Sequence, residues 1–295
     1  MCLLLVKSKM DQDYKIERLD FSNPEDMQKL VDLQNAVYAG KRVFTSSGFK
    51  YWYLDNPNGR VVSFNAIYGD IIAAHYALVP LKMKIEGRIA LGLLSMATVT
   101  HPDHRGKGLF KTLAKATYEY AVQEKYEFVI GVANANSYPG FIKYFDFQDV
   151  GQLEVMFGFN SNIRSKGEIL FKVFWDKAGL DWRIGRDCYS QDGTHVFGTK
   201  GVWIFKKAPL IKTFMGTHNF DEIKSLSLKK VNKWIRPLNL YVGMGSNAHE
   251  IGYLNVPKFI EHSPFHLIFL DLTGGKLPKM TKDNVFFQLM DFDVA

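Results

Sequence analysis

The sequence has little cysteine and no long apolar run. Cys2 and Cys188 are the two cysteines among 295 residues, which excludes a disulfide framework and a cysteine zinc site. No apolar run approaches the roughly 20 residues that cross a bilayer. The apolar start at residues 2–6 is shorter than a signal-peptide core of about 7–15 residues. We therefore expect a cytoplasmic protein without a membrane partner.

The sequence also lacks a basic run, although positive charge is in excess. It has 37 Lys and Arg against 30 Asp and Glu, a net charge of +7 and a pI near 9.1. Diffuse positive charge can attract a phosphate-rich small molecule. No motif that interleaves aromatic and basic residues is present, so we expect no nucleic-acid partner. No metal is expected either, because Pro264 breaks the helix that would pair His262 with His266.

Length and composition indicate a globular chain. With 47% apolar and 23% charged residues, the chain is long enough for two domains. Residues 160–168 are polar and form the best candidate boundary. We expect an N-terminal domain over residues 1–160 and a C-terminal domain over residues 161–295.

The first half alternates strand-like and helix-like segments. Asn23 and Pro24 predict a helix start, with Asn23 as the N-cap. Gly69 and Asp70 predict a two-residue hairpin. The expected strands are Tyr14–Leu19, Val61–Tyr68, Ile71–Met83, Arg88–Thr100, Glu127–Ala133 and Val150–Phe157, and later helices are expected near Phe49–Leu54, over Gly106–Glu124 and within Pro139–Tyr144. This order predicts a mixed α/β fold with one sheet.

The second half is less regular. Strands are expected at Thr194–Lys206, Leu238–Met244, His266–Leu272 and Val285–Asp291, with a helix over Asp221–Lys233. The apolar strands would be exposed alone. We therefore expect them to form a second sheet that packs on the first domain.

The segment from Ser95 to Leu113 carries the strongest chemical signal. A strand runs into a turn that holds Arg105, Gly106, Lys107 and Gly108, and a helix follows. The first N–H groups of a helix have no intrahelical partners and lie at its positive end. Glycine lets an anion approach the backbone, so the turn can cradle a phosphate. A plain connection with a solvated basic corner is the alternative reading, and His101 and His104 are expected to face solvent.

These residues resemble the signature of the GNAT superfamily of N-acetyltransferases, Arg/Gln-x-x-Gly-x-Gly/Ala. Arg105 and Gly108 match, whereas Phe110 replaces the last small residue. Downstream, Asn134 to Phe147 resembles the family's Asn-containing helix ending in Gly-Phe, with Asp146 where Gly is usual. The resemblance covers about residues 14–158 and implies a GNAT-like fold. The C-terminal half could be a degenerate GNAT-like repeat without a phosphate cradle.

The resemblance implies acetyl-coenzyme A (acetyl-CoA) as the acyl donor. The coenzyme's amide arm would lie along a strand edge, in a splay between this strand and Glu127–Ala133, and a backbone N–H near Val99 would polarise the thioester carbonyl. Backbone amides of the turn would hold the pyrophosphate. The implied cofactor-binding residues are Ala97, Thr98, Val99, Thr100, Arg105, Gly106, Lys107, Gly108, Leu109, Phe110, Asn134 and Asn136.

The proton carriers are less defined. The family's usual tyrosine falls at Phe141 or Ile142, which cannot donate a proton, so Tyr138 and Tyr144 are the candidate acids. His75 is a candidate base, with a hydrogen-bonded core histidine as the alternative. Asp291 and Asp293 could share a strand face and hold an ammonium substrate, with a solvated chain end as the alternative.

The sequence therefore predicts an acetyl-CoA-dependent N-acetyltransferase. The expected acceptor is the primary amine of a small molecule such as an amino sugar, with residues 161–295 shaping its pocket. Two alternatives stay open, a protein amine acetyltransferase and a non-catalytic module that binds CoA or acyl-CoA.

Overall fold

The computed structural model describes residues 14–40, 42–160, 162–184, 189–192, 195–196, 199–206, 212–219, 238–257 and 264–292. The chain forms two compact units. Unit 1 holds Met1–Pro80 and Leu93–Tyr126, and unit 2 holds Leu81–Gly92 and Glu127–Ala295. The expected mixed α/β fold is confirmed. The functional division at residue 160 stays a prediction.

In the described residues of unit 1, four strands lie in the order β1, β2, β3, β4. β1 pairs antiparallel with β2, and β2 with β3. The turn between β2 and β3 contains Gly69 with a φ of 57°, so the predicted hairpin is confirmed. The bounds are Lys15–Glu17 for β1, Val62–Tyr68 for β2, Ile71–Ile85 for β3 and Arg88–Thr100 for β4; the far ends of β3 and β4 belong to unit 2.

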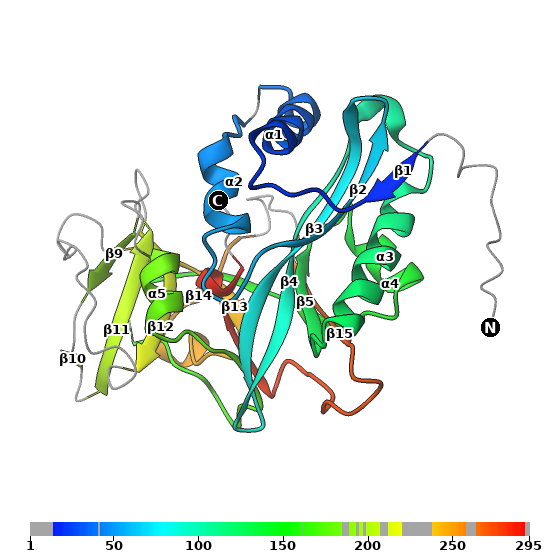
Figure 1. The fold of residues 1–295 in the computed structure, drawn as a ribbon. Helices are drawn as coiled ribbons and strands as arrows, with labels where there is room; N and C mark the ends of the chain where they lie inside the picture. Colours follow the sequence, from blue (N-terminus) through cyan, green and yellow to red (C-terminus); the bar gives the residue numbers. More distant parts are fainter. Residues whose placement is uncertain are drawn as a thin grey trace. The chain divides into compact units, whose positions relative to one another are not determined.

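Among the residues that the structure describes, three helices cover these strands: α1 (Pro24–Tyr38), α2 (Ser46–Tyr53) and α3 (Leu109–Gln123). In Figure 1, α1 and α2 lie on one side of the strands and α3 lies on the other. Helix α1 begins as predicted, because the Asn23 side chain accepts a hydrogen bond of 2.9 Å from the Glu25 amide. Helix α3 faces the strands with an apolar stripe that includes Leu113 and Ala121, both buried.

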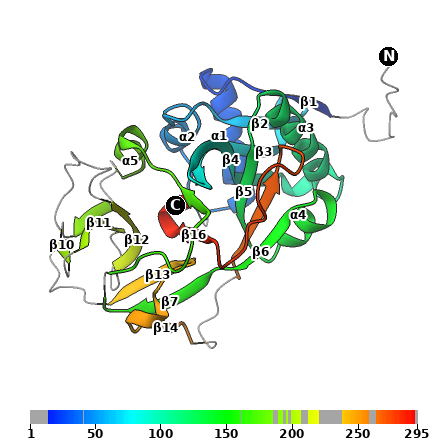
Figure 2. The same ribbon diagram turned by 90° about the horizontal axis from the view of Figure 1, so that it is seen from below.

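In unit 2, a strand from near the end of the sequence pairs with two strands from the first half. Strand β15 (His266–Asp271) lies between β5 (Phe128–Ala133) and β6 (Gln148–Gln152) and is antiparallel to both. Figure 2 shows β15 in orange at this position, with α4 (Tyr138–Tyr144) beside it. The expected separate second sheet is therefore wrong for this strand. It completes the sheet to which β5 and β6 belong.

The remaining strands of unit 2 extend that sheet. The order is β10, β11, β12, β13, β16, β8, the ends of β3 and β4, then β5, β15 and β6. Strand β7 pairs with β13 and β14, and β9 with β11. The bounds are Glu154–Gly158 (β7), Phe171–Val173 (β8), Tyr189–Asp192 (β9), His195–Val196 (β10), Thr199–Lys206 (β11), Lys212–Asn219 (β12), Asn239–Met244 (β13), Leu254–Asn255 (β14) and Val285–Gln288 (β16), with α5 at Lys177–Ile184.

In the second half, one predicted helix lies outside the described residues and one predicted strand is longer than the strand observed. The predicted helix over Asp221–Lys233 lies outside the described residues. The predicted strand over Val285–Asp291 is too long, because β16 ends at Gln288 and a 3₁₀ helix follows at Leu289–Asp291. That helix carries a capping box between Gln288 and Asp291.

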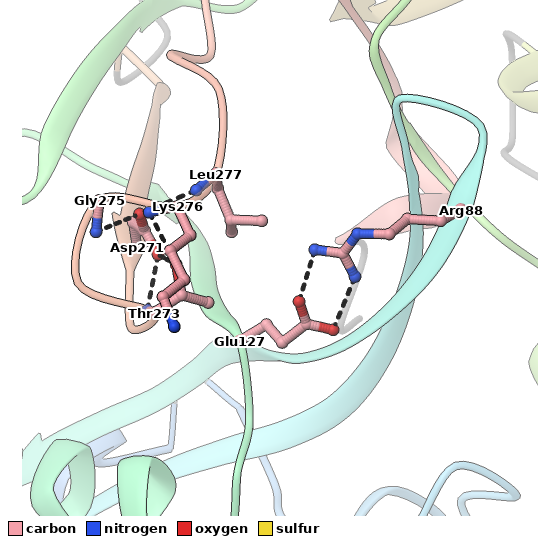
Figure 3. A network of polar contacts seen from close by, with 7 residues as sticks. All are labelled: Arg88, Glu127, Asp271, Thr273, Gly275, Lys276 and Leu277. Atoms are coloured by element: carbon pink, nitrogen blue, oxygen red, sulfur yellow. Dashed lines mark hydrogen bonds and ion pairs between the residues drawn. The ribbon is translucent and has the colours of Figure 1, made fainter.

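An ion pair fastens the start of β5. The Arg88 guanidinium donates to both Glu127 oxygens, at 3.0 and 2.6 Å. Figure 3 shows this pair and the nearby Asp271 carboxylate, which accepts from the Thr273, Gly275 and Leu277 amides. The two networks fix the adjacent ends of β4, β5 and β15. In the part of the chain that the structure describes, no helix is long and apolar enough to span a bilayer.

Candidate active site

The candidate residues fall in both units. In unit 1, β4 ends at Thr100 and a 3₁₀ turn at Pro102–His104 follows before α3. Gly106 and Gly108 have φ values of 74° and 72°, a conformation that side chains disfavour. Gly108 is the N-cap of α3 and supplies no side-chain cap. The turn thus presents the positive end of a helix, uncapped, to its surroundings.

The surface of this turn is open and basic. Arg105, Gly106, Lys107 and Gly108 are exposed, and a Cβ placed on Gly106 would meet no atom within 4 Å. An anion can therefore approach the backbone there. This local arrangement has the features of the predicted phosphate cradle.

Tyr14, the residue before β1, contacts two residues of the turn. Its hydroxyl lies 2.7 Å from Nδ1 of His104 and accepts from Nζ of Lys107 at 2.9 Å. His104 is buried at 8% exposure, so the expectation that it faces solvent is wrong. Burial, followed by the positive charge of Lys107, lowers the pKa of His104. His101 is half-buried, and its Nδ1 accepts from the Asp103 amide at 3.3 Å.

The strand that precedes the turn alternates in burial. Val99 is buried, Ala97 and Thr100 are half-buried and Thr98 is exposed. At the other end of the turn, Leu109 is buried and the Phe110 ring meets the Tyr76 ring edge-on, with centroids 5.8 Å apart. The Phe110 side chain therefore packs between α3 and β3. The coenzyme contacts of these residues, and the splay between β4 and β5, stay predictions.

In unit 2, Asn134 shapes the turn that leads into α4. Its Oδ1 accepts from the backbone amides of Asn136 and Ser137, at 3.0 and 3.1 Å. Asn134 and Asn136 are both exposed. Asp146, which follows α4, has a φ of 53°. This is the left-handed conformation for which glycine, the residue usual in the resembling pattern, is best suited.

Tyr138 begins α4 and takes part in a polar cluster. Its hydroxyl donates to Oδ2 of Asp149 at 2.7 Å, and this hydrogen bond raises its pKa. The other carboxylate oxygen, Oδ1, lies 3.4 Å from Nδ1 of His266. The rings of Tyr138 and His266 pack with centroids 4.2 Å apart. Three elements, α4, β6 and β15, thus bring one phenol, one carboxylate and one imidazole together.

The other proton-carrier candidates lie in different settings. Tyr144 is 46% exposed, and the Lys143 ammonium lies 5.4 Å from its ring centroid. His75 is buried, with Nε2 at 2.8 Å from the Tyr53 hydroxyl and Nδ1 at 2.7 Å from Oδ1 of Asn65. Burial lowers the pKa of His75 to about 3. Because both ring nitrogens are engaged in the core, we do not assign His75 a proton-transfer role.

Asp291 does not present a carboxylate to a substrate. It is buried at 3% exposure and accepts from Nε1 of Trp175 at 2.8 Å and from the Gln288 amide at 2.7 Å. The expectation that it binds an ammonium group on an open strand face is wrong, since β16 ends before it. Asp293 lies outside the described residues.

Comparison with known proteins identifies the N-terminal segment. A family profile described as an acetyltransferase (GNAT) domain matches residues 18–149. The GNAT resemblance is confirmed. Residues 18–149 are a GNAT acetyltransferase domain. This match supports an N-acyltransferase, as the sequence predicted. A search of curated proteins found no match.

Solved structures share the GNAT fold at low identity. One is a probable N-acyltransferase from Enterococcus faecalis, with a TM-score of 0.63 and 10% identity over 88% of this chain and 73% of that one. A GCN5-related N-acetyltransferase from Kribbella flavida has a TM-score of 0.60, 8% identity and coverages of 88% and 72%. Saccharomyces cerevisiae N-myristoyltransferase, solved with myristoyl-CoA, has a TM-score of 0.58, 7% identity and coverages of 96% and 86%.

Sequence reasoning found the basic turn and Tyr138 but missed the partners of Tyr138. Asp149 was not considered, and His266 was considered only as half of a broken metal pair. No local signal marks these two residues, because they lie on different strands and meet through strand pairing. The one available hint was a histidine at the start of an apolar strand.

Proposed function

We propose that the protein is an acetyl-CoA-dependent N-acetyltransferase that acetylates a primary amine on a small molecule such as an amino sugar. The observation that carries this proposal is the turn before α3. Two left-handed glycines, an uncapped helix start and the exposed Arg105 and Lys107 suit a pyrophosphate. Backbone amides from Arg105 to Phe110 would hold that group, and the edge of Ala97–Thr100 would bind the amide arm.

Tyr138 is the proposed general acid. The amine nitrogen attacks the thioester carbonyl, a C–N bond forms, and the C–S bond breaks to release a thiolate that needs a proton. The hydrogen bond to Asp149 raises the pKa of Tyr138, which keeps the phenol protonated at neutral pH. Tyr144, which is 46% exposed, is the weaker candidate. Asn134 and Asn136 are further proposed coenzyme-binding residues.

The coenzyme site is tested by a matched pair of variants, Gly108→Asn and Gly108→Asp. Both side chains tolerate the left-handed conformation and both can cap α3, so they differ mainly in charge. We expect Gly108→Asp to bind coenzyme A about tenfold or more weakly than Gly108→Asn in calorimetric titration, because its carboxylate opposes the pyrophosphate. Thermal unfolding of both variants serves as the control. Equal affinities in two folded variants would refute the cradle.

The acceptor is tested by thiol release from acetyl-CoA in the presence of an amine panel. The panel contains amino sugars, other small primary amines and peptides with a free N-terminus or lysine. We expect sustained turnover with amino sugars. Turnover with peptides alone would indicate a protein acetyltransferase, and coenzyme binding without turnover would indicate a binding module.

A further inference from the structure

In the cluster around Asp149, the imidazole of His266 is a further group that can take up a proton. The phenol of Tyr138 occupies Oδ2 of Asp149, and the imidazole of His266 faces Oδ1. Tyr138 would serve the leaving thiolate. The attacking amine, which is an ammonium ion at neutral pH, still needs a group to take its proton.

Strand register explains how Asp149 and His266 meet. His266 pairs with Ala133, the last residue of β5, so it lies at the end of the sheet where the Asn134 turn and α4 begin. Asp149 is opposite Ile268, two residues along β15 from His266. Residues in this diagonal relation lie on one face of a sheet and can interact. The register shifts between Leu267 and Ile268, and such bulges redirect side chains.

The surroundings of His266 leave one ring nitrogen for a substrate. The titratable groups that face it are Tyr138 from α4 and Asp149 from β6; Ala133 of β5 and Gln152 of β6, which pair with it, are not titratable. The side chain is 24% exposed. A carboxylate at Nδ1 favours the tautomer with the proton on Nδ1, which leaves the lone pair on Nε2. Within the part of the chain that the structure describes, Nε2 of His266 forms no hydrogen bond.

We infer that His266 is the general base of the proposed reaction and that Asp149 is its positioning residue, an inference that rests on the proposed function. Nε2 of His266 takes one proton from the substrate ammonium and passes it to solvent. The neutral amine then attacks the thioester. Tyr138 protonates the thiolate and regains a proton from the nitrogen as the amide forms. Of the two protons that the ammonium loses, one ends on the thiol and one in solvent.

The test compares His266→Phe, His266→Gln and Asp149→Asn with the parent protein. Phenylalanine keeps a ring packed on Tyr138 but cannot accept a proton, so it separates a catalytic role from a packing role. His249→Gln is the matched control, because His249 also faces a carboxylate, Glu154 at 3.5 Å, and is more exposed. The measurements are kcat/KM against pH with acetyl-CoA and the best amine, and coenzyme A affinity.

We expect both His266 variants to lower kcat/KM by about 10²–10⁴-fold, the usual contribution of a general base. Their profiles should lose the acidic limb that an imidazole gives between about pH 5 and 8. Asp149→Asn, which leaves the imidazole in place, should shift that limb and lower kcat more than it raises KM. Coenzyme A affinity and the His249→Gln profile should match those of the parent.

The outcomes separate this inference from the proposed function. A parent without turnover on any amine refutes the proposed function itself. An active parent and a His266→Phe variant with the same rate and pH profile refute the role of His266 alone, as does a loss of coenzyme A binding in a folded variant. If the His266 variants fail to fold, an unchanged pH profile in Asp149→Asn is enough to overturn the inference.

Discussion

At the scale of single residues, the hydrogen bonds of Asn65 determine which nitrogen of His75 carries a proton. Nδ2 of Asn65 donates to the Glu17 carbonyl, so Oδ1 of Asn65 faces Nδ1 of His75. The proton of the imidazole therefore sits on Nδ1, and Nε2 accepts from the Tyr53 hydroxyl. This series of hydrogen bonds joins α2, β2 and β3 within unit 1, and it requires a neutral imidazole.

His75 should make folding depend on pH. Its pKa is about 3 in the folded protein but about 6.5 when unfolded, so between these values the unfolded chain binds more protons. The free energy of unfolding should therefore fall as the pH drops below about 6.5, by up to about 1.4 kcal/mol per pH unit. Urea unfolding at pH 4.5–7.5 should show a shallower fall for His75→Gln than for the parent.

Asp291 acts in the opposite direction, because burial raises its pKa to about 6. It stabilises the fold below its unfolded pKa, and that contribution is lost as the pH rises through 6. A His75→Gln variant with the parent's pH dependence would contradict the assignment.

At the scale of elements, the contact between β4 and β5 depends on Gly92, which has no side chain. A Cβ on Gly92 would lie 2.5 Å from ring atoms of Phe128, and Phe128 is fully buried against Phe269, with ring centroids 5.7 Å apart. The Phe128 ring thus fills the space that Gly92 leaves. Neither strand could keep its place if both side chains were large.

We predict that Gly92→Ala lowers the free energy of unfolding by about 1–3 kcal/mol, because overpacking forces a buried ring to move. Chemical denaturation measures the change. Gly48→Ala is the control: its Cβ would have an ordinary contact at 3.5 Å. Adding Phe128→Leu to Gly92→Ala should recover part of the loss, and additive losses would argue against the contact.

Local sequence signals predicted the elements whose formation depends on residues close together in the sequence. Asn23 and Pro24 placed the start of α1, Gly69 placed a hairpin, and the basic glycine turn placed the start of α3. The position of β15 could not be predicted, because an apolar run does not specify which strands it pairs with. For the same reason Tyr138 was found from its motif, whereas Asp149 and His266 depend on strand register.

At the scale of the whole molecule, the sheet of unit 2 joins strands that lie more than a hundred residues apart in the sequence. We predict that a fragment ending at residue 160 does not fold cooperatively, because it leaves β5 and β6 without the strand between them. Thermal unfolding followed by circular dichroism, with size-exclusion chromatography, would check this. A peptide of residues 264–273 should partly restore the transition, and a monomeric fragment with a sharp transition would refute the prediction.

The place of β15 also bears on how the protein is made. During synthesis, β5 and β6 leave the ribosome long before His266–Asp271 does, at rates of about 5–20 residues per second. Until then the apolar residues Val129 and Ile130, buried in the finished protein, border a sheet edge that has no partner strand. Such an edge invites pairing with other chains. Nascent chains that stall before residue 266 should therefore need chaperones, and they would lack His266 as well as the strand that carries it.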